Sequence, residues 1–134
     1  MLLEIANEDR VITITADPAF PVAIIGSPLI ATYNSTWSLK NKINNKKTLL
    51  ELSWTMPPNS CNRDGLGQVN MTGGSGLITS KACLKVKAEG NFPILKNDFG
   101  YCSCIFYWIW PFPVGSGHCK FTITNAGQNK VKAQ

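Results

Sequence analysis

The segment from Tyr101 to Lys120, YCSCIFYWIWPFPVGSGHCK, places the greatest constraint on how this chain can fold. It contains three of the five cysteines and the only histidine, and these residues flank an apolar run from Ile105 to Val114. Thiolate sulfur and imidazole nitrogen are the ligands that structural zinc sites use. The segment therefore predicts a metal site that clamps the two ends of one hydrophobic arm.

The spacing of these residues limits how they can meet. Cys102 and Cys104 are separated by one residue, so a strand would place both on one face. His118 and Cys119 are adjacent, and both could bind one metal only from a turn, which Gly115-Ser116-Gly117 would permit. Two other interpretations stay open: burial of these thiols as small core side chains, or a disulfide between Cys119 and either Cys102 or Cys104.

Two further apolar features have a plain interpretation as core. Cys83 lies inside the segment ACLKV and is expected to be a small buried side chain. The run from Ile105 to Val114 is expected to pack into the core, with an exposed surface that meets a partner or touches a membrane as the alternative. This run is too short, and too rich in proline, for a membrane-spanning helix, which needs about 18 apolar residues.

Length and charge indicate a single cytosolic domain. A chain of 134 residues with 44% hydrophobic residues has the size and composition of one domain, residues 1–134. The net charge of +5 comes from lysines in residues 40–47, 81–87 and 130–132, apart from the aromatic residues, so no nucleic-acid partner is expected. The start, MLLEIANEDR, reaches three acidic residues before any apolar stretch and predicts no signal peptide.

Short β-branched runs punctuated by glycine, asparagine and proline predict an all-β meander or prism of short strands. A short helix near residues 37–47 is the one helical alternative, although a strand at Thr48–Thr55 fits as well. The remaining expected strands are Val11–Thr15, Pro21–Ile25, one from Leu29, Leu77–Thr79, Ala82–Ala88, Phe92–Leu95, Lys120–Thr124 and Lys130–Ala133.

Residues 56–76, MPPNSCNRDGLGQVNMTGGSG, predict a long ordered loop. The segment has two prolines and five glycines and lacks apolar periodicity. Long ordered loops of this kind usually carry function rather than core. Cys61 lies in this loop, so it is less easily explained as a core side chain.

Two segments echo each other and carry a resemblance to a known family. GSGLITSKACLKVKAEG and HCKFTITNAGQNKVKAQ both contain KVKA, at Lys85–Ala88 and Lys130–Ala133. SKACLKVKAEGNFPILKND and TNAGQNKVKA resemble the PAAR and PAAR-like proteins, which are small conical β proteins stabilised by a metal. The resemblance covers about Cys61 to Gln134. Residues 1–55 lie outside it and are treated as an N-terminal extension to a metal-stabilised β region at residues 56–134.

The resemblance implies a structural role at the tip of a contractile injection machine, either a type VI secretion system or a phage tail. The chain would cap a trimeric β-helical spike (VgrG-like or a phage spike) and sharpen it with a bound zinc. Such a protein resides in the bacterial cytoplasm before injection or in the virion, touches a target membrane transiently, and in some cases carries an effector. The family's histidine-rich ligands are replaced here, and the implied zinc ligands are Cys61, Cys102, His118 and Cys119, with Cys104 as a substitute.

Two other functions are alternatives. A small β-barrel that binds a ligand is the main alternative. A cysteine hydrolase would need a cysteine activated by His118 and oriented by Asp98 or Asp64. The chain supplies these residue types but no nucleophile-elbow motif and no phosphate-binding glycine loop, so no enzymatic activity is expected.

Overall fold

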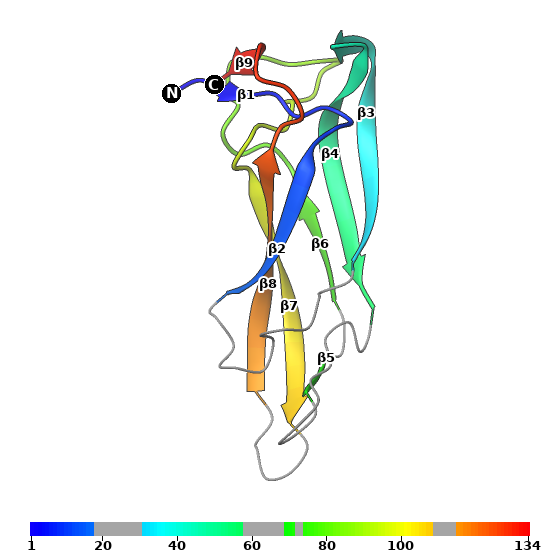
Figure 1. Cartoon of the computed structure of the whole chain (residues 1–134), viewed down its shortest axis with the longest axis vertical. Coiled ribbons are helices and arrows are strands. Elements are labelled where there is room, and N and C mark those ends of the chain that lie inside the picture. The colour runs from blue at the N-terminus through cyan, green and yellow to red at the C-terminus, as the bar shows by residue number, and fades with distance from the viewer. Residues whose placement is uncertain (18–30, 58–68, 72–73, 109–114) are drawn as a thin grey trace.

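The computed structural model describes residues 1–17, 31–57, 69–71, 74–108 and 115–134, and these residues form strands and connections without a helix (Figure 1). The all-β prediction is confirmed for them. The strands are β1 (Leu3–Glu4), β2 (Val11–Asp17), β3 (Thr32–Ile43), β4 (Lys46–Met56), β5 (Val69–Met71), β6 (Gly74–Ile78), β7 (Phe99–Trp108), β8 (Gly115–Asn125) and β9 (Lys132–Ala133). No helix that could cross a membrane is present in this described part.

The strands form three antiparallel sheets, with the orders β1-β9, β2-β8-β7-β5 and β3-β4-β6. Six strands follow the long axis of the molecule: β2, β4 and β7 run away from the end that holds both termini, and β3, β6 and β8 return to it (Figure 1). Several neighbours are distant in sequence, since Val11 lies opposite Asn125. The connectivity is therefore not that of a simple meander. Turn signals in the sequence locate the turns but do not identify the partner of each strand.

The helix considered for residues 37–47 is wrong. These residues form the end of β3, a two-residue turn at Asn44 and Asn45, and the start of β4. Both asparagines have positive φ, 54° and 62°. A hairpin turn with positive φ at both central residues matches the twist of the flanking strands, and asparagine tolerates this conformation. Asn44 and Asn45, which have low helix propensity, are thus the residues that close the β3–β4 hairpin.

Two other expected strands are absent. Residues 79–98 form a long connection in which Ala88 and Asn91 make an isolated bridge, so no strand covers Ala82–Ala88 or Phe92–Leu95. The expected strands at Val11–Thr15 and Lys120–Thr124 are confirmed inside β2 and β8. The strand expected at Pro21–Ile25 and most of the predicted loop lie outside the described residues.

The main core lies between the two larger sheets, and the first 55 residues supply much of it. The indole of Trp54 stacks on the ring of Phe121 with centroids 4.3 Å apart, and the ring of Tyr33 meets Phe121 edge-on at 6.1 Å. Each large apolar side chain buried in this way contributes about 1.5–3 kcal/mol. The buried members are Ala6, Leu49, Leu52, Trp54, Met56, Ile78, Ile94, Cys119, Phe121, Ile123 and Ala126. Residues 1–55 and 56–134 therefore share one core.

Two glycines allow the strands β6 and β7 to approach the indole of Trp54. A Cβ atom added at Gly76 or at Gly100 would collide with the indole, and at Gly76 it would also lie 2.7 Å from the carbonyl oxygen of Tyr101. The absence of a side chain at these two positions is what makes room for the stack of Trp54 on Phe121.

Replacing Gly76 with alanine is expected to lower the free energy of unfolding by about 1–3 kcal/mol, because the added methyl group overpacks the core. Urea unfolding followed by tryptophan fluorescence measures the change. The matched control is Ser75→Ala at the exposed neighbouring position, which should stay within about 0.5 kcal/mol of the wild type. A Gly76→Ala protein as stable as the wild type would contradict the close contact.

Candidate functional site

The strand register brings three of the predicted metal ligands to one part of the β7–β8 pair. Cys102 lies opposite Cys119, and Cys104 lies opposite Gly117. Directly paired and alternate positions share a face of a sheet, so positions 102, 104 and 119 fall on the same face, as the spacing of Cys102 and Cys104 predicts. The pairing of position 102 with position 119 could not be read from the sequence.

The other two predicted ligands are placed differently. His118 lies opposite Ser103 and takes a register position on the other face of β8 from Cys119. Gly115-Ser116-Gly117 do not form the turn from which His118 and Cys119 could both bind one metal, because these residues begin the strand β8. Cys61 lies outside the described residues. Those side chains that the structure describes contain no group of three or more potential metal ligands.

The shared face of positions 102, 104 and 119 is the one that faces the core. Cys119 is fully buried, as are Phe121 and Ile123, the next alternate residues along β8. Thiolates are ligands for a soft metal, and three of them from positions 102, 104 and 119 would leave one position of a zinc tetrahedron for a fourth ligand. Paired positions on neighbouring strands also have the spacing that a disulfide requires, so the register alone leaves both chemistries open.

Asp98 is a buried carboxylate that holds the long connection 79–98 in place. Its side chain is almost fully buried, and its Oδ2 atom accepts a hydrogen bond from the amide of Leu95 at 2.8 Å. It also accepts hydrogen bonds from the amides of Lys81 and Ala82 and from the hydroxyl of Ser80. Burial nevertheless raises the pKa of Asp98, since desolvation of the charge outweighs the hydrogen bonds that favour it. The carboxylate thus pins both ends of this connection together.

The raised pKa of Asp98 predicts a loss of stability with rising pH. The folded state holds this proton more tightly than the unfolded state, so the contribution is complete below the ordinary pKa of 3.8 and is lost as the pH rises through the raised folded value. Urea unfolding of the wild type and of Asp98→Asn between about pH 3 and 7 should show wild-type stability falling relative to the variant.

Glu51→Gln on the exposed face of β4 is the control for the loss of a carboxylate elsewhere on the protein. The opposite slope in the comparison with Asp98→Asn would mean that the hydrogen bonds to the carboxylate outweigh its burial.

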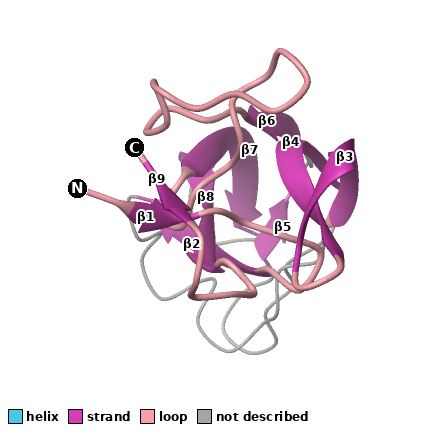
Figure 2. Ribbon diagram, turned by 90° about the horizontal axis from the view of Figure 1, so that it is seen from above, coloured by secondary structure: helices cyan, strands magenta, loops and turns pink. Residues whose placement is uncertain are grey.

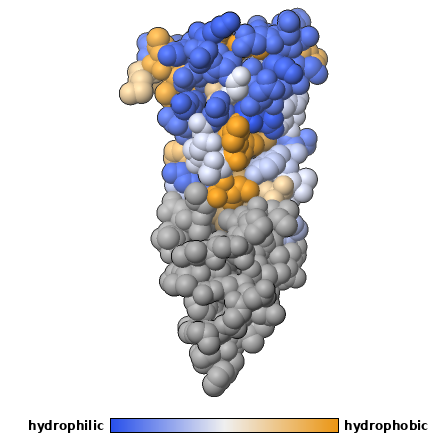
Figure 3. Space-filling view, viewed as in Figure 1, coloured by the Kyte–Doolittle hydropathy of each residue, from blue (hydrophilic) through white to orange (hydrophobic). Residues whose placement is uncertain are grey.

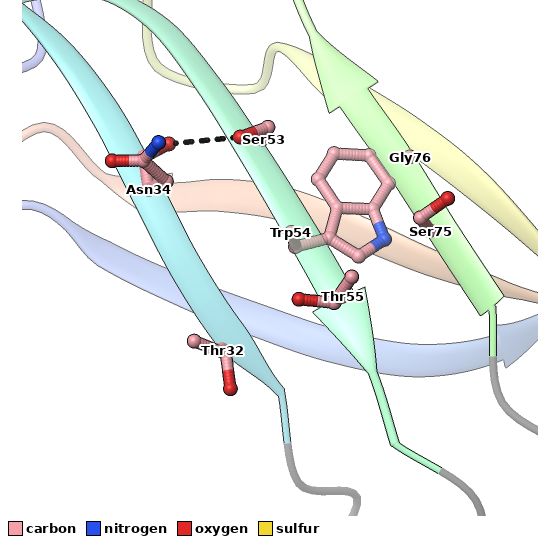
Figure 4. Close-up of a pocket in the computed structure, with 7 residues that line it drawn as sticks. All are labelled: Thr32, Asn34, Ser53, Trp54, Thr55, Ser75 and Gly76. Carbon is pink, nitrogen blue, oxygen red and sulfur yellow. Dashed lines mark hydrogen bonds between the residues drawn. The ribbon is translucent and has the colours of Figure 1, made fainter.

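Two surface hollows have volumes in the range of small-molecule sites, about 300–1,000 Å³. A groove of about 320 Å³ crosses the sheet β3-β4-β6 and is lined by hydroxyl and amide side chains, among them Thr32, Asn34, Thr55 and Ser75 (Figure 4). The hydroxyl of Ser53 in this groove donates to the carbonyl of Asn34 at 3.4 Å. A second hollow, of about 420 Å³, is lined by Glu4, Asn44, Lys96 and residues 125–129. The lining of the second hollow is predominantly polar, unlike that of most small-molecule sites, whereas apolar atoms make up the larger part of the lining of the first.

The end of the molecule that holds both termini is built from three connections around a common centre (Figure 2). We call it the connection end; its parts are the β3–β4 turn, residues 79–98 between β6 and β7, and residues 126–134 with 1–10, which lead from β8 and into β2. Three backbone hydrogen bonds form a closed ring there: Ala6 donates to Ile94 at 2.8 Å, Ile94 to Leu49 at 2.8 Å, and Leu49 to Ala6 at 2.9 Å. The three residues are fully buried and lie 43 and 45 residues apart in sequence.

The same interval recurs around this ring. The bridge between Ala88 and Asn91 corresponds to the pair Ile43 and Lys46, 45 residues earlier. Glu89 and Gly90 have positive φ, 53° and 83°, as do Asn44 and Asn45. The third equivalent pair joins the two ends of the chain, because Leu3 of β1 lies opposite Ala133 of β9, 45 residues after Ala88. The connection end therefore has quasi-three-fold symmetry within one chain.

Sequence reasoning found only part of this arrangement. The repeated KVKA at residues 85–88 and 130–133 marks two of the three copies, and the third is Lys40-Asn41-Lys42-Ile43, which keeps only the lysines. The 45-residue spacing of the lysine pairs is the signal that could have revealed it. Comparison with models of protein families, with curated proteins and with solved structures finds no match for this chain.

Proposed function

We propose that this protein is a structural tip that caps a trimeric β-helical spike of a contractile injection machine, with its connection end facing the spike. The observation that carries the proposal is the quasi-three-fold arrangement around Ala6, Leu49 and Ile94. The resemblance of residues 61–134 to PAAR-like proteins supports it independently. The protein would accordingly occur in the bacterial cytoplasm before injection or in a phage tail.

Symmetry is the physical reason why the connection end would suit the end of a trimeric spike. A single chain that binds the end of a trimer on its axis meets three identical surfaces at once, so it uses all of them only if it presents three similar surfaces itself. Three paired segments recur here at intervals of 45 residues: Ile43 with Lys46, Ala88 with Asn91, and Ala133 with Leu3. Main-chain groups and apolar contacts of these segments would meet the ends of the spike strands.

Zinc is the second part of the proposal. Cys102, Cys104 and Cys119 are the residues that would hold it, since the register places them on one face of β7–β8. A closed thiolate site at this place would tie β7 to β8 and add to the stability of the folded chain. It would act as a structural metal, with no step of a reaction assigned to it.

Stoichiometry tests the capping function. Mixed with a purified trimeric β-helical spike protein, the chain is expected to bind as one copy per trimer, measured by light scattering after size-exclusion chromatography. Binding of three copies, or none, would contradict capping along the three-fold axis. A spike shortened by its last β-helical turns is the control and should not bind.

Metal and thiol content tests the zinc site. Protein purified without chelator is expected to carry near-stoichiometric zinc, with thiols that react only after chelation or unfolding, because metal-bound thiolates are protected. Cys102→Ser and Cys119→Ser should lose the zinc and lower the melting temperature, whereas Cys83→Ser, whose thiol donates to the carbonyl of Val86, should keep the metal. Metal-free protein with a disulfide at Cys102 and Cys119 would overturn this part.

A further inference from the structure

Three pairs of lysines surround the connection end, one pair in each of its quasi-equivalent parts. They lie at intervals of 45 residues, and each pair precedes a buried residue: Ile43, Ala88 or Ala133. All six lysines are exposed, and hydrophilic residues dominate this end of the molecule in Figure 3. The pairs are Lys40 with Lys42, Lys85 with Lys87, and Lys130 with Lys132.

These lysines carry charge that is not neutralised within the described part of the chain. The ion pair found there joins Lys46 to Asp9 at 3.9 Å and involves none of the six. Nearby acidic groups are engaged elsewhere, since Glu89 accepts a hydrogen bond from the amide of Lys40 at 2.8 Å and Glu8 accepts one from the amide of Lys47 at 2.6 Å. Glu8 and Glu89 keep their negative charge in these hydrogen bonds, but they are two carboxylates beside six lysines, so the ring of lysines remains positively charged.

We infer that this lysine ring binds acidic side chains repeated three times around the end of a trimeric protein partner. The inference rests on the proposed function and specifies that the spike surface bound by the connection end is negatively charged. A positive ring facing a negative ring would steer the chain onto the axis and set its orientation, because charge complementarity acts on association rate and specificity. Each chain of the partner would supply the acidic residues for one lysine pair.

A protein partner fits this surface better than a nucleic acid does. Val86 and Val131 lie between the lysines of the second and third pairs and are 43% and 42% exposed. Apolar side chains between cations suit a protein interface, whereas single-stranded nucleic acids require aromatic side chains on which bases can stack. The aromatic ring next to these lysines, Phe92, is already covered by the ammonium group of Lys87 at 4.9 Å.

The test uses a trimeric coiled coil whose three chains each end in a short Glu/Asp-rich peptide. We expect it to bind at least about 100-fold more tightly than the same peptide as a monomer, because simultaneous contacts raise the effective concentration. Binding should weaken at least about tenfold when the salt is raised from about 0.05 to 0.3 M, since salt screens exposed charges. Isothermal titration measures both.

Single charge reversals provide the controls. Lys42→Glu, Lys87→Glu and Lys132→Glu should weaken binding of the acidic trimer to the same extent within about threefold, because quasi-symmetry makes the three positions equivalent. Lys120→Glu, which makes the same charge change on β8, should have little effect. A trimer ending in Gln/Asn-rich peptides should not bind.

Three outcomes would overturn the inference: a trimer that binds no better than the monomer, three reversals with unrelated effects, or equal binding of a DNA duplex of the same charge. The result is separable from that of the proposed function. If the β-helical spike still binds one copy of the triple variant Lys42→Glu, Lys87→Glu, Lys132→Glu, the capping function is supported and the role of the lysine ring is contradicted. If the acidic trimer binds as expected and the spike does not, the acid-binding role of the lysine ring is supported and the capping function is contradicted.

Discussion

The ring of hydrogen bonds among Ala6, Leu49 and Ile94 is the constraint on which the rest of the structure depends. Each of the three amides donates to the next carbonyl, and none of these residues is exposed to water. A buried backbone group that loses its hydrogen-bond partner lowers the stability of the fold by about 1–3 kcal/mol. Displacing any one of the three segments would leave such a group unpaired on each of the other two. The three segments come from distant parts of the sequence, so the ring fixes where the strands β2, β4 and β7 leave the connection end. Long-range contacts predominate throughout this fold.

Much of the fold could be predicted from local patterns, and the missing part is non-local. The β-branched run at Val11–Thr15 predicts β2, and the C-x-C spacing predicts that Cys102 and Cys104 share a face. The sequence does not reveal that Cys119 lies opposite Cys102, because register is set by the packing of whole sheets. The asparagines at 44 and 45 weaken a helix and close a hairpin equally well, so only the strand context decides between the two.

Polar side chains that would suggest chemistry in the sequence act here as structural hydrogen-bond partners. Asp98, a candidate for orienting a catalytic histidine, accepts hydrogen bonds from Ser80, Lys81, Ala82 and Leu95. Asn7 is fully buried, and its Oδ1 atom accepts from the amide of Asp9 at 2.9 Å. Gln128 donates to the carbonyls of Ile5 and Val131 and accepts from the amides of residues 130 and 131. Side chains of this kind take the place of regular strand ladders where three irregular connections converge.

The antiparallel pairing of β1 with β9 has a consequence for the order of the elements along the chain. The amino group of Met1 lies 3.2 Å from the side-chain oxygen of Gln134. The two ends of this sequence thus meet at the position that is quasi-equivalent to the tight turn of the β3–β4 hairpin. A short linker could therefore join them, and the chain could be opened between Asn44 and Asn45 instead. Such a circular permutant would keep every sheet and the central ring of hydrogen bonds. Strand pairing holds the two segments together at each of these positions, so a peptide connection there is not required.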